Sequence, residues 1–430
     1  MKLRLVPAPQ GARWLLVLLA PAAAGCGSGV EARAHSPSSA VESVPRPDVL
    51  VVAVDGFSLD DIGVFGGDLV ATAGFDQLAE EGTVYVDGFT PSPWPDEALA
   101  SLLTGRRAAL SDGKPWTPSL AESLKHVGYR TALVLGHEQH EPELLLPDEN
   151  VSGFESTLLP PAASTVAGAR ADEVADAALA WLGDVTGPVL MVATFADPRP
   201  PHHLYSGLVP AADVPYEGPV SAGLSHAELL RRADSFTEDD RARLAELHAS
   251  EIAMVDAQFM RLAGAVVARR TTPAVLVVVG LRPAALGQAG RYGLVPSFDP
   301  GALQVPIMMR FPEPLEPDSA PPLRGDVEVP ASLADVGPTL LDSLGFEPRY
   351  DIDGRSLFPG TRLDGAREIL SLTRRGLHGR CLISGDRAVS VQFAPDVERY
   401  YRRPSSAEPF VETTEPTSRE LDLARRLRNH

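Results

Sequence analysis

From Pro47 onward, short apolar runs alternate with segments of helical periodicity, and this alternation constrains the fold more than any other feature of the chain. The runs cover Val49–Val54, Thr131–Leu135, Val189–Phe195, Ala274–Val279 and Val305–Phe311. Their short length and nearly continuous apolar character predict strands that are buried on both faces. Helical patterns lie between them, at Phe75–Glu81, Glu97–Thr104, Ser119–Val127, Ala171–Leu182, Asp239–Val267 and Ser332–Leu344. Together they predict an α/β fold with a doubly wound, mostly parallel sheet and helices on both faces.

Composition divides the 430 residues, 44% of them hydrophobic, into four expected segments. These are a signal peptide at 1–26, a flexible tether rich in Ser, Gly and Pro at 27–46, the α/β domain at 47–368, and a small subdomain at 369–430. The last segment predicts an antiparallel α+β subdomain, because residues 380–403 alternate in polarity like a hairpin. Ser418–Asn429 has the pattern of a capped terminal helix.

The N-terminus has the pattern of an export signal. Basic residues precede the apolar run Trp14–Gly25, which is too short to span a bilayer. The run ends in Ala-Ala-Gly-Cys, which resembles the lipobox of bacterial lipoproteins, although Ala23 stands where leucine is usual. We therefore expect lipidation of Cys26 and an exported protein anchored to a membrane of the cell envelope, on its periplasmic or surface side. The alternative is an ordinary cleaved signal peptide with an incidental cysteine.

The net charge opposes a nucleic-acid partner, and the cysteine content limits the possible disulfides. A formal net charge of −19 argues against nucleic acid, because phosphate binding needs clustered Lys and Arg. Cys26 and Cys381 are the two cysteines of the chain, so lipidation of the first leaves no intramolecular disulfide. The exported fold then depends on its hydrophobic core.

A series of phrases, in a fixed order, is similar to the sulfatase family of the alkaline phosphatase superfamily. They include "PDVLVVAVDGFSLDDIGVFGG" (47–67), "ASLLTGRR" (100–107), "EIAMVDAQFMRLAG" (251–264) and "SLADVGPTLLDSLGF" (332–346). The resemblance covers about residues 47–360 and implies an alkaline-phosphatase-like fold. Because one fold hosts many activities, the function has to be inferred from the site.

The resemblance implies two requirements for the family's reaction: a nucleophile and a hard divalent cation. The nucleophile is usually a formylglycine made from Cys or Ser, and the cation activates it and binds the ester oxygens. Asp55 matches the family's first metal-binding aspartate, and Gly56 follows it where a second Asp is common. The nucleophile position falls on Pro95, which has no nucleophilic atom. The segment Pro95-Asp96-Glu97 instead predicts a helix N-terminus.

The second half of the family's metal site follows the expected strand Ala274–Val279. There Leu281 stands for the ligating Asp, and Arg282 stands for the ligating His or Asn. An apolar side chain coordinates nothing, and a guanidinium repels a cation. A further family histidine is replaced by Arg199.

Four histidines raise the alternative of a new transition-metal site: His137, His140, His202 and His203. Loop histidines are more often simply solvated, and we expect that here.

These losses favour a catalytically inactive sulfatase-like lipoprotein that keeps a binding or scaffold role. No catalytic residue is intact and no cofactor is expected. Arg282 and Arg199 are candidates for binding an anionic group, on a glycan or a protein partner, and the alternative for both is a surface ion pair. A second hypothesis is an active sulfuric or phosphoric ester hydrolase with a non-standard nucleophile and one divalent cation such as calcium. A third is a purely structural envelope protein.

Overall fold

The computed structural model describes residues 46–107, 118–136, 153–161, 168–209, 216–293, 295–312, 324–348, 350–358, 367–373, 379–393, 395–406 and 408–429. The expected signal peptide at 1–26, its Cys26, and all of the expected tether except Arg46 lie outside these residues. His137 and His140 lie outside them as well.

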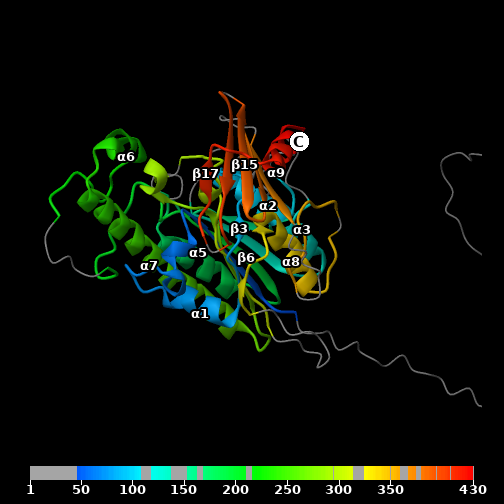
Figure 1. Cartoon of the computed structure of the whole chain (residues 1–430). Helices are drawn as coiled ribbons and strands as arrows, with labels where there is room; N and C mark the ends of the chain where they lie inside the picture. Colours follow the sequence, from blue (N-terminus) through cyan, green and yellow to red (C-terminus); the bar gives the residue numbers. More distant parts are fainter. Residues whose placement is uncertain are drawn as a thin grey trace, which may run out of the picture. The chain divides into compact units, whose positions relative to one another are not determined.

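The central sheet is mixed and mostly parallel (Figure 1), as the sequence pattern predicts. Within the described residues, eight strands take the order β11-β2-β10-β7-β1-β6-β4-β5. Their bounds are β1 Val49–Asp55, β2 Thr83–Tyr85, β4 Arg130–Leu135, β5 Ser156–Leu158, β6 Val189–Phe195, β7 Val275–Arg282, β10 Ile307–Arg310 and β11 Gly325–Val327. Strands β7, β1, β6, β4 and β5 run parallel, whereas β10 is antiparallel to both β7 and β2. The five parallel strands end at one edge of the sheet, where α/β proteins place their ligands.

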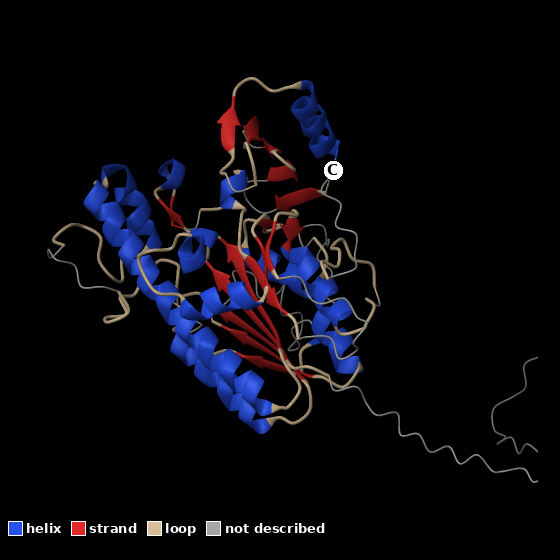
Figure 2. Cartoon of the chain, turned by 60° about the horizontal axis from the view of Figure 1, so that its bottom comes forward, coloured by secondary structure: helices blue, strands red, loops and turns tan. Residues whose placement is uncertain are grey.

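Helices cover both faces of this sheet (Figure 2), which confirms the doubly wound architecture. Helices α1, α5 and α7 pack on one face, and α2, α3 and α8 pack on the other. The described helices are α1 Ala73–Glu81, α2 Pro95–Thr104, α3 Leu120–His126, α5 Ala171–Asp184, α6 His226–Arg232, α7 Glu238–Arg269, α8 Val336–Ser343 and α9 Ser418–Asn429. None of these helices is long and apolar enough to cross a membrane.

Strand β1 explains why helices are needed on both sides. Leu50, Val52 and Val54 belong to the core beneath α1, α5 and α7, whereas alternate residues such as Val49 and Val51 belong to the core beneath α2, α3 and α8. All five side chains have an exposed fraction of 0%. Because successive side chains of a strand point to opposite faces, a run that is apolar throughout requires two cores.

The C-terminal part is a five-stranded antiparallel sheet with one helix, as expected for an α+β subdomain. Its strands, in spatial order, are β13 Glu368–Thr373, β14 Gly379–Ser384, β15 Arg387–Phe393, β16 Asp396–Arg402 and β17 Val411–Thr413. One face of the sheet packs on α9, and the other contacts Phe89 and Leu303 of the α/β part. Short strand pairs complete the described chain, namely β3 Gly88–Phe89 with β12 Ala331–Ser332, and β8 Ala285–Leu286 with β9 Tyr292–Gly293.

A buried ion pair joins this subdomain to the α/β part. Arg403 follows β16, and its Nη2 donates to the carboxylate of Asp87 over 2.7 Å. Both side chains are almost fully buried, and the guanidinium also lies over the ring of Phe410. Burial raises the pKa of Asp87, while hydrogen bonding from Arg403 and its charge act in the opposite direction.

We predict that Arg403→Met lowers the free energy of unfolding by about 3–5 kcal/mol at neutral pH, because it leaves the Asp87 carboxylate buried and unpaired. The difference in stability between wild type and Arg403→Met should shrink in acid, because a protonated Asp87 carries no charge that needs a partner. The pKa of Asp87 is higher in the folded chain than in the unfolded chain, so the free energy of unfolding falls as pH rises between the two pKa values. Urea unfolding at several pH values measures this.

Arg425→Met is the matched control, because Arg425 forms an exposed pair with Asp422 at 3.6 Å. Its cost should stay within about 0.5 kcal/mol. Equal losses in the two variants would contradict a role for the Asp87–Arg403 pair.

Candidate functional site

Three charged residues lie at or just beyond the carboxyl ends of the three adjacent strands β7, β1 and β6. Asp55 is the last residue of β1, and Arg282 is the last residue of β7. Arg199 lies in the loop that follows β6. Because the three strands are parallel neighbours, their ends open onto one region, where ligands bind in such sheets.

Asp55 and Arg282 form a buried, two-point ion pair. Nε of Arg282 donates to Oδ1 of Asp55 over 2.7 Å, and Nη2 donates to Oδ2 over 3.2 Å. The carboxylate has an exposed fraction of 0% and the arginine one of 7%. Both carboxylate oxygens therefore already accept hydrogen bonds from a permanent cation.

The backbone around this pair leaves little room for a further ligand. The carbonyl oxygen of Arg282 accepts from the N–H groups of both Gly56 and Phe57, each over 3.0 Å. Gly56 has a φ of 86°, and a Cβ added there would lie 2.5 Å from the carbonyl oxygen of Pro198. Leu281 is buried in the core beneath α2, α3 and α8. Neither position 56 nor position 281 supplies a carboxylate.

Arg199 is held close to the Asp55–Arg282 pair by its own loop. Its N–H donates to the carbonyl of Asp197, whose carboxylate accepts from the N–H of Ala171 and from the hydroxyl of Tyr205. Burial raises the pKa of Asp197 to about 6.

Burial lowers the pKa of Arg199, the charge of Asp55 opposes this effect, and the charge of Arg282 adds to it. Arg199 is therefore within electrostatic reach of the pair. Anion binding by Arg199 and Arg282 stays a prediction. At Arg282 an anion has to compete with a carboxylate that is already in place, and this ion pair is buried rather than superficial.

Pro95, which the sequence resemblance places at the family's nucleophile position, lies in the first turn of α2. The hydroxyl of Ser92 donates to the carboxylate of Glu97, and the hydroxyl of Thr373 donates to its other oxygen over 3.2 Å. Ser101 donates its hydroxyl to the Glu97 carbonyl. Ser92 and Ser101 are both buried, so the two serine hydroxyls closest in sequence to the expected nucleophile hold the helix start in place.

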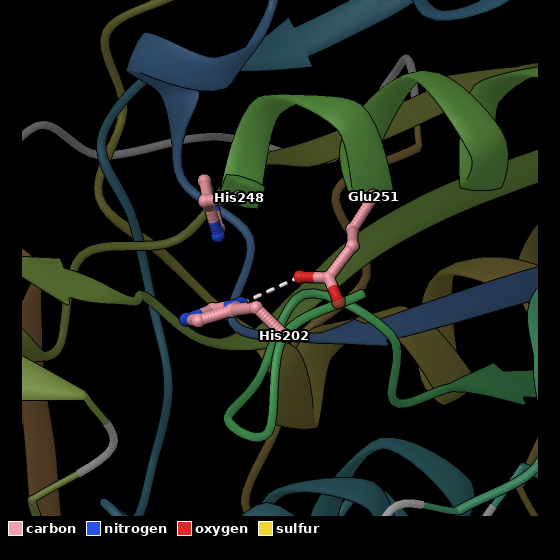
Figure 3. Close-up of side chains that lie close together, drawn as sticks. All are labelled: His202, His248 and Glu251. Carbon is pink, nitrogen blue, oxygen red and sulfur yellow. Dashed lines mark hydrogen bonds and ion pairs between the residues drawn. The ribbon is translucent and has the colours of Figure 1, made fainter. Parts of the chain in front are cut away.

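Of the four histidines expected to be solvated, His202 differs from the expectation, and His203 is half-buried. His202 is not solvated: it is 4% exposed, and its Nδ1 lies 2.6 Å from Oε2 of Glu251. Burial lowers the pKa of His202 to about 3 and raises that of Glu251 well above its usual value. His248 lies one turn before Glu251 on α7, and its imidazole faces that of His202 (Figure 3).

The resemblance to the family's sequence phrases indicated neither His248 nor the pairing of Glu251 with a histidine. The available signal was the spacing His-Ala-Ser-Glu at 248–251, since residues three apart on a helix share a face.

Comparisons with known proteins agree on one family. A sequence model of the family described as Sulfatase matches residues 47–346. An arylsulfatase of Clostridium perfringens (strain 13 / Type A) is 27% identical over 122 residues, which are 26% of this chain and 24% of that protein. Arylsulfatase G of Rattus norvegicus is 30% identical over 109 residues, which are 22% of this chain and 21% of that protein. The matches thus span less than a quarter of the length of these two relatives.

Solved structures extend the similarity to nearly the whole chain. The crystal structure of phosphonate monoester hydrolase of Agrobacterium radiobacter superposes with a TM-score of 0.66 at 18% identity, covering 89% of this chain and 95% of that one. An identity this low supports the fold and not the activity.

We predict that Arg282→Met and Asp55→Asn each lower the free energy of unfolding by about 3–5 kcal/mol, because each leaves one buried charge without its partner. The double variant should lose less than either single variant, since no unpaired charge remains. A double-mutant cycle in urea measures the coupling.

Arg261→Met is the control, because the Arg261–Asp176 pair is largely exposed and is worth at most about 1 kcal/mol. Additive losses for Asp55→Asn and Arg282→Met would show that the two side chains do not depend on each other.

Proposed function

The chain belongs to the sulfatase family, and we propose that it is a member without ester-hydrolase activity that serves a binding or scaffold role at the cell envelope. The observation that carries this proposal is the buried ion pair between Asp55 and Arg282. In this pair, Asp55 is the residue that matches the family's first metal-binding aspartate. Its partner Arg282 stands where the resemblance places a ligating His or Asn.

The charges at the strand ends do not fit the divalent cation that the family's reaction needs. A cation there needs several oxygen ligands, and Asp55 offers both of its oxygens to the guanidinium. A second cation next to Arg282 is opposed by a like charge in a poorly solvated place, where Coulomb repulsion is weakly screened. Removing the guanidinium of Arg282 would not restore a cation site, because the side chains at Leu281 and Gly56 provide no further ligand.

The nucleophile position supports the same conclusion. Pro95 offers no hydroxyl or thiol, and its ring is suited to the first turn of α2. Asp96 and Glu97 place negative charge at the positive end of the helix dipole, where an active family member needs room for an anionic ester. Substrate sulfate or phosphate is therefore repelled at the helix start.

The alternative, an active hydrolase with a non-standard nucleophile, defines the substrates to test. The two relatives are named arylsulfatases, and the structural neighbour is named a phosphonate monoester hydrolase. Aryl sulfates, aryl phosphates and phosphonate monoesters thus cover the relevant ester classes.

We predict no turnover of 4-nitrophenyl sulfate, 4-nitrophenyl phosphate or a 4-nitrophenyl phosphonate ester above the buffer control, with or without Ca²⁺, Mg²⁺, Mn²⁺ or Zn²⁺. The assay should use enough protein that even a slow enzyme, at about 1 per second, consumes measurable substrate within minutes. Turnover that follows the protein through successive purification steps would contradict the proposal. Ser92→Ala then tests whether the buried hydroxyl beside Glu97 is responsible.

The envelope role rests on the N-terminal sequence. We propose that Cys26 carries a lipid that anchors the chain to a membrane, and that the binding partner is an anionic glycan or a protein. Nucleic acid is not part of the proposal, because the net charge of −19 opposes it. Arg282 and Arg199 are the candidate contacts for an anion. At Arg282 the anion competes with Asp55, so Arg199 is the first of the two to test.

We predict that metabolic labelling with an alkyne fatty acid marks the full-length protein, and that Cys26→Ser abolishes both the label and detergent-dependent extraction from membranes. Cys381→Ser is the matched control. Cys381 has an exposed fraction of 0% in the C-terminal sheet, so it is not available for acylation and its replacement should leave the label unchanged. A label that persists in Cys26→Ser would contradict the lipid anchor.

A further inference from the structure

His202, His248 and Glu251 bring three metal-ligating atoms together, away from the strand-end ion pair. Taking one atom from each side chain, all three lie within 4.8 Å of one another. The residues are 4%, 2% and 0% exposed, respectively. His248 and Glu251 project from adjacent turns of α7 toward His202, which comes from the loop after β6 (Figure 3).

His248 is oriented as metal-binding histidines usually are. Its Nε2 lies 2.9 Å from Oδ1 of Asp61, in the short helix η1 Leu59–Asp61. When Nε2 carries the proton and donates it to this carboxylate, Nδ1 carries a free lone pair. Nδ1 is buried and has no hydrogen-bond partner among the described residues. A carboxylate on the far nitrogen fixes the tautomer and increases the basicity of the other nitrogen.

Glu251 is likewise fixed by a second contact. Its Oε1 accepts from the backbone N–H of His203 over 2.5 Å, while Oε2 faces Nδ1 of His202 over 2.6 Å. An ion that binds both of these atoms takes the place of any proton held between them, and that proton leaves to solvent.

A structural role explains the His202–Glu251 contact, because it attaches the loop after β6 to α7. It does not explain His248, whose Nδ1 is buried at an energetic cost if nothing binds it. A buried nitrogen without a hydrogen-bond partner among the described residues, on a ring that packs edge-on against His202, therefore points to a ligand that accepts electron pairs.

We propose that His202, His248 and Glu251 bind one divalent transition-metal ion of the zinc type, with Asp61 as the carboxylate that orients His248. Two imidazole nitrogens and one carboxylate oxygen form a three-ligand zinc set that leaves a fourth position for water. Calcium and magnesium prefer oxygen ligands alone, so the set selects against them. Tetrahedral metal–ligand bonds of about 2.0–2.2 Å place the ligand atoms about 3.3–3.6 Å apart, so the 2.6 Å contact has to open and a separation near the 4.8 Å limit has to close.

An acidic cavity offers a route to this set. It has a volume of about 140 Å³, and its lining includes His248, Asp60, Asp61 and Asp68. Three carboxyl groups at its wall attract a divalent cation from solvent toward His248. Of the three proposed ligands, His248 lines this cavity, so an ion in the cavity reaches the set through His248.

The test is zinc binding by the purified full-length protein after removal of metals, measured by competition with a chromophoric chelator. We expect one high-affinity Zn²⁺ per chain and no comparable binding of Ca²⁺ or Mg²⁺. His248→Gln and Glu251→Gln should weaken zinc binding more than Asp61→Asn, for which a loss of roughly 10–100-fold is expected. Binding by wild type that both ligand variants retain in full would place the zinc elsewhere and overturn the proposal.

His203→Gln is the matched control, because His203 adjoins His202 and only its backbone contacts Glu251. It should leave zinc affinity unchanged. If a ligand variant fails to fold, the visible spectrum of Co²⁺ bound to the wild-type protein decides. Intense tetrahedral bands support the site, whereas the weak bands of an octahedral ion or the absence of binding overturn it. Since these variants leave Asp55 and Arg282 unchanged, the result is independent of whether the protein hydrolyses esters.

Discussion

The pairing of Asp55 with Arg282 is the interaction on which the rest of the strand-end site depends. Parallel strands β1 and β7 are neighbours, so their last residues meet, and a carboxylate buried there requires a positive charge. In a metalloenzyme that charge is an exchangeable ion. Here the guanidinium of Arg282, which is part of the chain, supplies it. Once the guanidinium fills this role, the positions beside it no longer need carboxylates, and Gly56 and Leu281 instead allow close packing.

The proposed loss of the nucleophile is consistent with the same cause. Without a cation to lower its pKa, a hydroxyl at the start of α2 is a poor nucleophile, so replacing it with Pro95 removes little that remains useful. The acidic residues that follow then improve the helix start. Nucleophile and metal ligands are thus coupled by chemistry, although they are far apart in the sequence.

Much of the fold followed from local pattern. Strand β6 and helix α9 have the predicted bounds, and β1 differs by one residue, because buried apolar runs and capped helices are encoded within a few neighbouring residues. The antiparallel direction of β10 was not predictable, since it depends on the path of the chain between strands. Strands β13 and β17 lie outside the stretch that alternates in polarity. β13 is almost wholly buried and β17 is short and exposed, so neither was recognised.

The two sites show what sequence can reveal about chemistry and where it stops. Asp55, Arg282 and Pro95 were found because a family pattern assigned a role to each position. Their pairing required the order of the strands. No family pattern assigned a role to His202, His248 or Glu251, and their meeting depends on how a loop packs on α7. One site pairs a carboxylate with an internal cation, whereas the other brings two imidazoles and a carboxyl group together. If the proposed site binds zinc, a metal found in this protein would not by itself indicate catalysis, because the resemblance assigns none of His202, His248 and Glu251 a role in the family's reaction.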